Sequence, residues 1–181
     1  MDHIFIYALP TNNTKEARIL EISAVRAEGF ACRKQDMRET FTGKSESNSR
    51  KLLSDMREKI YTSNPFVVVS YCSEITRTLL RNEYANSGLE DMFAGRAWID
   101  INQLAWPLAA GRFIQSRTLD SLCKHFKITL EPQADSADIC VAMIQIYRGM
   151  MQRYRTALSG EEAIREVGGE TLENVRKIMG F

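Results

Sequence analysis

The segment Ser116–Met151 reads SRTLDSLCKHFKITLEPQADSADICVAMIQIYRGMM, and it carries the clearest helical pattern in the chain. Its first half predicts a short helix over residues 118–126. Its second half predicts a long amphipathic helix over residues 134–155, because apolar side chains recur there at helical spacing. These side chains are Cys140, Met143, Ile144, Tyr147, Met150 and Met151. Asp135, Ser136 and Asp138 fall in the first turn, where backbone N–H groups lack partners and the helix dipole favours negative charge. We therefore expect this helix to pack along its length and to hold carboxylates at its start.

The length and composition are those of a globular protein. The chain has 181 residues, of which 44% are hydrophobic and 26% are charged, so it predicts one domain with a substantial core. The formal net charge of +1 gives no strong overall field, and a nucleic-acid partner would need a local basic patch. No run of about 18 apolar residues occurs, so we expect no membrane partner and a cytoplasmic location. We expect the four cysteines to be reduced core residues and not zinc ligands; they are Cys32, Cys72, Cys123 and Cys140.

The remaining segments predict alternating strands and helices. The expected strands are His3–Leu9, Arg18–Arg26, an edge strand within Phe30–Phe41, Phe66–Ser70 and Ala97–Asp100. The expected helices are Lys51–Tyr61, Glu74–Asn86 and Ile101–Leu108, with a polar loop over Gly43–Arg50. The uninterrupted apolar run of Phe66–Ser70 (FVVVS) is typical of a central parallel strand that is covered on both faces. Together these elements predict an α/β fold, a mixed sheet with helices on its faces.

Four stretches, taken in order, resemble the DnaQ-like (DEDDh) 3′–5′ exonucleases. They are Ile19–Val25 (ILEISAV), Trp98–Asp100 (WID), Leu119–Phe126 (LDSLCKHF) and Ala134–Tyr147. The resemblance implies an RNase H-like fold, a mixed central β-sheet flanked by helices, over residues 1–155. It leaves residues 156–181 as a helical C-terminal extension, in which Gly168 and Gly169 would separate two short helices.

The resemblance also implies where the chemistry of the family would be located. Family members hold two divalent metal ions with four carboxylates and use a histidine as general base. The corresponding positions in this chain are Tyr7, Leu9, Thr76, Gln133 and Asp138. Thr76 corresponds to the second motif of the family, which follows the apolar strand Phe66–Ser70. A shift of the alignment by one residue there would put Ile75 in place of Thr76. Of these residues only Asp138 offers a carboxylate, the ligand that a hard cation such as Mg²⁺ prefers, and Gln133 cannot take up a proton near neutral pH. The sequence therefore predicts a vestigial catalytic site that holds no metal.

Other carboxylates leave a second interpretation open. Glu74, Asp100 and Asp135 could complete an unorthodox metal cluster around Asp138. Asp100 and Asp135 are instead predicted to cap the helices that follow them. Glu21, on the second strand, is predicted to be a structural pairing residue.

Basic and aromatic side chains provide a different kind of candidate site. Arg112 and Arg117 flank the junction before the 118–126 helix, near the expected substrate groove of the family, and Trp106 and Phe113 are close in sequence. Such a patch would bind single-stranded nucleic acid, although scattered basic residues also occur on ordinary solvated faces. Further members of this candidate set are Arg77, Arg81 and Trp98.

The sequence thus predicts a catalytically degenerate 3′–5′ exonuclease-like protein, which is not an enzyme and needs no cofactor. It would serve as a nucleic-acid-binding module, or as a protein-interaction module whose partner is a nucleic-acid enzyme. The alternative is an active 3′–5′ exonuclease on single-stranded DNA or RNA, with a non-standard site that uses Mg²⁺ or Mn²⁺. The Met-rich face Met143–Met151 fits a homodimer interface and burial against the domain's own sheet equally well.

Overall fold

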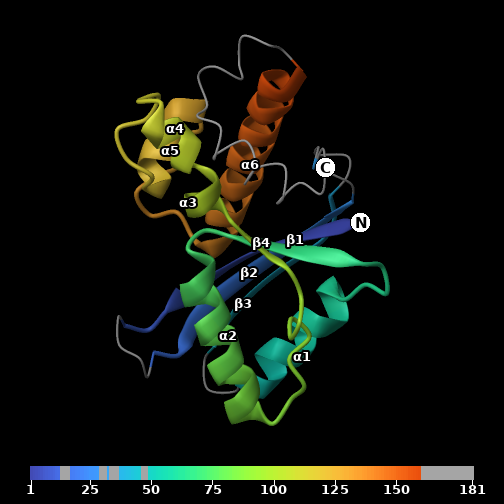
Figure 1. Cartoon of the computed structure of the whole chain (residues 1–181). Helices are drawn as coiled ribbons and strands as arrows, with labels where there is room; N and C mark the ends of the chain where they lie inside the picture. Colours follow the sequence, from blue (N-terminus) through green and yellow to red (C-terminus); the bar gives the residue numbers. More distant parts are fainter. Residues whose placement is uncertain (13–16, 29–31, 33–36, 46–48, 160–181) are drawn as a thin grey trace.

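A mixed five-stranded sheet forms the centre of the molecule. The computed structural model describes residues 1–12, 17–28, 32, 37–45 and 49–159. The strands lie in the order β3-β2-β1-β4-β5 (Figure 1). They are β1 (Asp2–Pro10), β2 (Ile19–Glu28), β3 (Met37–Lys44), β4 (Phe66–Ser70) and β5 (Trp98–Asp100). β2 is antiparallel to β1 and β3, whereas β4 is parallel to β1 and β5. The predicted α/β fold class and the parallel setting of Phe66–Ser70 are therefore confirmed.

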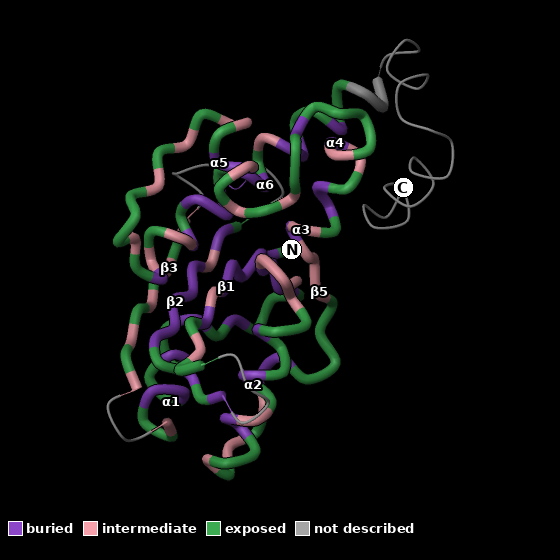
Figure 2. Tube along the Cα trace, turned by 90° about the vertical axis from the view of Figure 1, so that its left-hand side faces the viewer, coloured by how far each residue is buried: buried purple, intermediate pink, exposed green. Residues whose placement is uncertain are grey.

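Helices cover both faces of this sheet. One face carries α1 (Ser49–Ile60) and α2 (Ser73–Ser87). The other face carries α3 (Ile101–Leu104), α4 (Trp106–Ala110), α5 (Leu119–Phe126) and α6 (Ser136–Ser159), with α6 drawn in orange to red in Figure 1. Each face has its own apolar core, and β1 contributes to both because successive side chains of a strand point to opposite faces. Phe5 and Tyr7 belong to the α6 core, and Ile4 and Ile6 belong to the α1/α2 core. Figure 2 shows the buried residues concentrated along β1 and β2.

The long helix packs as its periodicity predicts. All six of its predicted apolar residues are buried in the α6 core: Cys140, Met143, Ile144, Tyr147, Met150 and Met151. The Met-rich face is thus buried against the chain's own sheet. α5 packs closely beside it, since a Cβ added at Gly149 would lie 2.5 Å from a ring carbon of Phe126.

The third strand corrects the sequence prediction. β3 runs over Met37–Lys44, so it begins and ends later than the predicted segment Phe30–Phe41, of which residues 30–31 and 33–36 lie outside the described part. It occupies the predicted edge position. Threonine and aromatic side chains favour an extended backbone, and pairing with β2 continues as far as Lys44 opposite Glu21. Of the predicted loop Gly43–Arg50, the first two residues belong to β3 and the last two to α1, Ser45 lies in neither, and residues 46–48 lie outside the described part.

The predicted helix Ile101–Leu108 is wrong in its continuity. The structure has two short helices, α3 and α4, with Ala105 between them. Pro107 has no N–H to donate, and its ring clashes with the carbonyl group four residues earlier, so one helix cannot run through this position. The N–H groups of Leu108 and Ala109 bond instead to the carbonyl of Ala105. Ile75, the alternative to Thr76 in the second motif, has a side chain that is 58% exposed.

The other predicted features vary in outcome. Cys32, Cys123 and Cys140 are buried and Cys72 is partly exposed, and none of the four forms a disulfide. Of the predicted helical extension over residues 156–181, residues 156–159 belong to α6 and residues 160–181 lie outside the described part. Among the helices of the described residues, none has the length and apolar character needed to cross a membrane.

Candidate functional site

Tyr7 and Leu9, the positions that correspond to the first motif of the exonuclease family, lie on β1. Tyr7 is half-buried in the α6 core, close to the end of β1, and Leu9 is 37% exposed. Burial raises the pKa of Tyr7, and Cys72, Cys140 and Tyr71 raise it further. The phenol is therefore neutral at physiological pH, and the leucine side chain has no donor atom. Neither side chain fits a hard divalent cation, which prefers charged or carbonyl oxygen ligands.

Thr76, which corresponds to the metal-binding position of the second motif, is buried and hydrogen-bonded to a residue of β4. Its side chain is 2% exposed, and its hydroxyl accepts a hydrogen bond of 2.9 Å from Ser70 Oγ. Ser70 follows Val68 by two residues on β4, and Val68 packs in the α1/α2 core, so strand alternation places Ser70 on that face. Tyr7 packs in the α6 core on the opposite face. The side chains of Thr76 and Tyr7 therefore pack on opposite faces of the sheet.

Asp138, the one carboxylate of the family pattern, takes part with Asp135 in a cap at the start of α6. Oδ1 of Asp135 accepts hydrogen bonds of 2.9 Å from the N–H groups of Ala137 and Asp138. Oδ2 of Asp138 in turn accepts the N–H of Asp135 at 3.4 Å. This reciprocal arrangement satisfies N–H groups that a helix start leaves without partners. Gln133 is exposed three residues before α6. The prediction that Asp135 caps the helix is confirmed.

Glu21 fixes the start of α6 to the sheet. Its Oε1 accepts the N–H of Ser136 at 2.8 Å, and Lys44 Nζ lies 3.6 Å from its Oε2. Hydrogen bonding to Ser136 lowers the pKa of this carboxyl group, so it is charged at neutral pH. Beside it, Ser23 Oγ lies 2.7 Å from Ser136 Oγ. Glu21 is thus a structural pairing residue, as the sequence predicts.

Both carboxylate oxygens of Asp100 also accept hydrogen bonds from backbone and side-chain donors. Oδ1 accepts the N–H groups of Asn102 at 2.8 Å and Gln103 at 3.2 Å, which confirms the predicted cap of α3. Oδ2 accepts both the N–H and the hydroxyl of Ser73, at 2.7 and 2.9 Å. Asp100 therefore ties the start of α2 to the start of α3.

The sequence gives no sign of a polar network that lies next to Asp100. Tyr71 Oη and Asn102 Nδ2 both donate to the carbonyl of Arg117, at 3.1 and 3.0 Å. The Arg117 guanidinium donates to the carbonyl of Asn102 at 3.3 Å. The turn after β4, the helix α3 and the loop before α5, which are distant in sequence, meet here. Arg117 is accordingly half-buried and holds the loop before α5 in place.

The described residues do not fit the two-metal site of the exonucleases. Within the part of the chain that the structure describes, no three His, Cys, Asp or Glu side chains form a group that could hold a metal ion. The carboxylates nearest to the family pattern are engaged as helix caps, and the tyrosine is neutral. A metal pair has too few anionic ligands here to balance its charge.

Three members of the second candidate set lie on α4 and the loop that follows it, whereas Arg77 and Arg81 are on α2 and Trp98 is on β5. Trp106 and Phe113 are each 50% exposed, and Arg112 is also exposed. Arg112 has φ of 59°, a left-handed conformation that favours glycine. The Phe113 ring folds back over Gly111, where an added Cβ would lie 2.6 Å from a ring carbon. We call Trp106, Arg112 and Phe113 the α4–α5 surface.

Comparison with known proteins reveals a structural likeness without a sequence match. No protein-family model and no curated protein matches the chain. Solved structures of 3′–5′ exonucleases do superpose on it. An E. coli exonuclease I–ssDNA complex has a TM-score of 0.63 and 10% identity, and the match covers 87% of this chain. The nuclease domain of 3′hExo, a DEDDh family member bound to rAMP, has a TM-score of 0.59 and 13% identity, with 83% of this chain and 92% of that domain covered. The fold is that of a DnaQ-like exonuclease.

The chain spans less than half of the exonuclease I structures that it resembles, since the match covers 43% of their length. A 3′-exonuclease described in 3′-end-specific recognition of histone mRNA stem-loop matches over 81% of its length, with a TM-score of 0.59 and 13% identity. At these identities the likeness concerns the fold.

Proposed function

We propose that this protein uses the DnaQ-like exonuclease fold to bind single-stranded nucleic acid without hydrolysing it. The observation that carries the proposal is the engagement of Asp138, the one carboxylate of the family pattern, in a reciprocal cap with Asp135. Two-metal hydrolysis requires carboxylates that are free to coordinate and that converge on one point. Tyr7 and Thr76, which belong to opposite faces of the sheet, supply neither charge nor convergence.

The binding half of the proposal rests on the α4–α5 surface. Exposed aromatic rings can stack on bases of any sequence, with about 1–3 kcal/mol per base, and an arginine beside them neutralises a phosphate. Trp106, Arg112 and Phe113 present these groups within eight residues. The likeness to an exonuclease I–ssDNA complex and to a 3′-exonuclease that recognises a histone mRNA stem-loop supports a nucleic-acid ligand.

The test measures binding and cleavage on the same single strand. A fluorescently labelled strand of about 12 nucleotides, within the usual site size of single-strand binders, is titrated with the protein at several salt concentrations. We expect saturable binding that weakens with salt, and no shortening of the strand in Mg²⁺ or Mn²⁺. Phe113→Ala should weaken binding by about tenfold, the effect of one lost stacking contact. Val141→Ala, at an exposed apolar residue on α6, is the matched control.

Two results would overturn the proposal. Metal-dependent shortening of the strand from its 3′ end would support the active-exonuclease alternative. Failure of the full chain to bind any single strand would reject the nucleic-acid function and leave the protein-interaction alternative.

A further inference from the structure

A pocket of about 170 Å³ lies between α2 and the segment that leads into β5. Its polar lining comes from Arg77, Arg81, Asp91 and Trp98, with Phe93 and Gly95 beside them. Phe93 and Trp98 pack with the α1/α2 core, so the pocket lies on the face of the sheet opposite α6. It shares no residue with the α4–α5 surface.

The indole nitrogen of Trp98 is buried and donates to no acceptor among the described residues. An indole N–H is a donor only, and native proteins rarely leave such a group unpaired because its desolvation is costly. Because this nitrogen is buried, Trp98 serves the pocket as an aromatic wall and as a fluorescent reporter, and not as a donor.

Two arginines give the pocket its charge. Arg77 and Arg81 are four residues apart on α2, a spacing that places side chains next to each other on one helix face. Both are exposed, and the described part of the chain offers neither of them an ion pair or hydrogen bond. Asp91 offsets one positive charge, and its Oδ1 already accepts the N–H of Phe93 at 2.8 Å. The lining therefore has a net charge of +1 and a clear excess of donors over acceptors.

The volume is suited to a small oxyanion. A water molecule takes about 30 Å³ in the liquid, so the pocket holds on the order of five waters. That is enough space for a phosphate group, whose oxygens are strong acceptors and match the planar donor geometry of arginine.

We propose that this pocket is a phosphate-binding site, in which Arg77 and Arg81 hold the anion beside the Trp98 ring. Two sources offer a phosphate with the same chemistry, a nucleic-acid backbone and a free phosphorylated metabolite. The proposal does not rest on the proposed function, because the two sites lie on different elements.

The first experiment reads the pocket directly. The sequence has two tryptophans, so Trp106→Phe leaves Trp98 as the single indole fluorophore. Inorganic phosphate is titrated into this variant at constant ionic strength, with chloride as the reference anion. We expect a saturable change in Trp98 fluorescence with phosphate and none with chloride. Adding Arg77→Gln and Arg81→Gln should weaken the affinity by about tenfold or more, since each removes a charge-assisted contact.

Controls keep the result specific. Arg148→Gln removes an exposed arginine from α6, on the other face of the sheet, and should leave phosphate affinity unchanged. Equal phosphate affinity with and without the two arginines, or no saturable response, would overturn the proposal.

A second arm assigns the source of the phosphate. If the labelled single strand competes with phosphate and also binds more weakly to the Arg77→Gln/Arg81→Gln variant, the pocket holds a backbone phosphate. If ribose 5-phosphate competes and the single strand does not, the ligand is a free phosphorylated molecule. Both outcomes support the pocket, and failure of strand binding alone would count only against the proposed function.

Discussion

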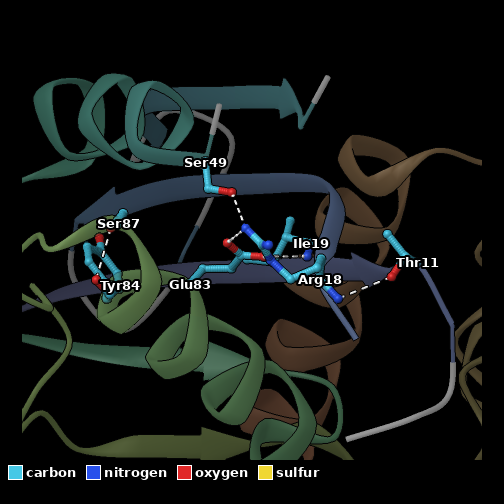
Figure 3. Close-up of polar contacts among 7 residues, drawn as sticks. All are labelled: Thr11, Arg18, Ile19, Ser49, Glu83, Tyr84 and Ser87. Atoms are coloured by element: carbon cyan, nitrogen blue, oxygen red, sulfur yellow. Dashed lines mark hydrogen bonds and ion pairs between the residues drawn. The ribbon is translucent and has the colours of Figure 1, made fainter. Parts of the chain in front are cut away.

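Arg18 and Glu83 form a two-point ion pair at the start of β2, although 65 residues separate them in sequence. Arg18 Nη2 lies 2.9 Å from Glu83 Oε2, and Arg18 Nε bonds to Oε1. Oε1 also accepts the N–H of Ile19 at 3.0 Å, and the same guanidinium donates to Ser49 Oγ at 2.8 Å (Figure 3). Glu83 is 1% exposed, so this cluster links α2, β2 and α1 at a buried point.

Glu83→Gln should destabilise the protein by about 1–3 kcal/mol, because it leaves the bonds to Arg18 and Ile19 weakened in a buried place. Urea unfolding at pH 7 measures the change. Glu90→Gln, whose side chain is 86% exposed beside Arg57, is the control and should have little effect. Equal midpoints for Glu83→Gln and the parent protein would contradict this prediction.

The same carboxylate should make stability depend on pH. Burial acts to raise the pKa of Glu83, but hydrogen bonds from Arg18, Ser49 and the Ile19 N–H, with the charge of Arg18, outweigh burial and lower it. A lowered folded pKa contributes stability above the unfolded value of about 4.3, and this contribution is lost as pH falls through the folded pKa. The difference in melting temperature between the parent protein and Glu83→Gln should therefore shrink as pH is lowered from 7 to 3. A difference that stays constant over this range would show that ionisation of Glu83 has no part in it.

Arg112→Gly should stabilise the fold and weaken nucleic-acid binding together. A left-handed conformation costs a side-chain-bearing residue roughly 1–2 kcal/mol, and glycine avoids this cost. Glycine also has a higher entropy in the unfolded chain, which offsets part of the benefit, so we expect the free energy of unfolding to rise by about 0.5–1 kcal/mol. Loss of one phosphate contact should also reduce the salt slope of single-strand binding by about 0.7.

Lys127→Gly is the matched control, because Lys127 ends α5 with φ of 57°. It should give the same gain in thermal stability with unchanged binding. If both variants bind equally well, Arg112 does not contact the ligand.

Asp138→Asn should leave single-strand affinity and Mn²⁺ uptake unchanged, since the side chain only accepts the Asp135 N–H. Fluorescence anisotropy and calorimetry measure the two quantities. A loss of either one on this substitution would indicate that Asp138 still acts in a metal or nucleic-acid site.

Asp100→Ala should cost about 2 kcal/mol, because it removes a helix cap and also the link to Ser73. Thermal unfolding measures the loss. Asp120→Ala, in the first turn of α5 with a 74% exposed side chain, should change stability by less than about 0.5 kcal/mol. A metal-ligand role would instead show as lost metal affinity with normal stability.

The sequence pattern was sufficient to predict those elements and caps whose decisive contacts join residues close in sequence. The periodicity of α6 and the apolar run of β4 identify their elements, because burial of one face follows from the spacing of side chains. The caps at Asp100 and Asp135 were predictable for the same reason, as their partners lie two or three residues away. The bounds of β3 depend on pairing with β2, and propensity alone gives them only approximately.

Long-range polar partners could not be predicted in this way. Nothing in the sequence near Glu83 indicates Arg18, and nothing near Tyr71 indicates the carbonyl of Arg117. The family resemblance gave the positions of the vestigial site, but the placement of Thr76 and Tyr7 on opposite faces of the sheet follows from the bond of Thr76 to Ser70 and the packing of Tyr7 in the α6 core. The Arg77–Arg81–Trp98 pocket required the fold, since its walls come from two separate segments.

The hydrogen bonds that join α6 to β1 and β2 connect residues 113 to 144 positions apart. Contacts of such long sequence separation must close large loops before they stabilise anything, which slows folding. At ~5–20 residues per second, the ribosome needs on the order of ten seconds to reach α6 after synthesis begins. During that interval Phe5, Val25 and Val69 have no α6 to cover them. We expect the nascent chain to depend on chaperones until this helix emerges.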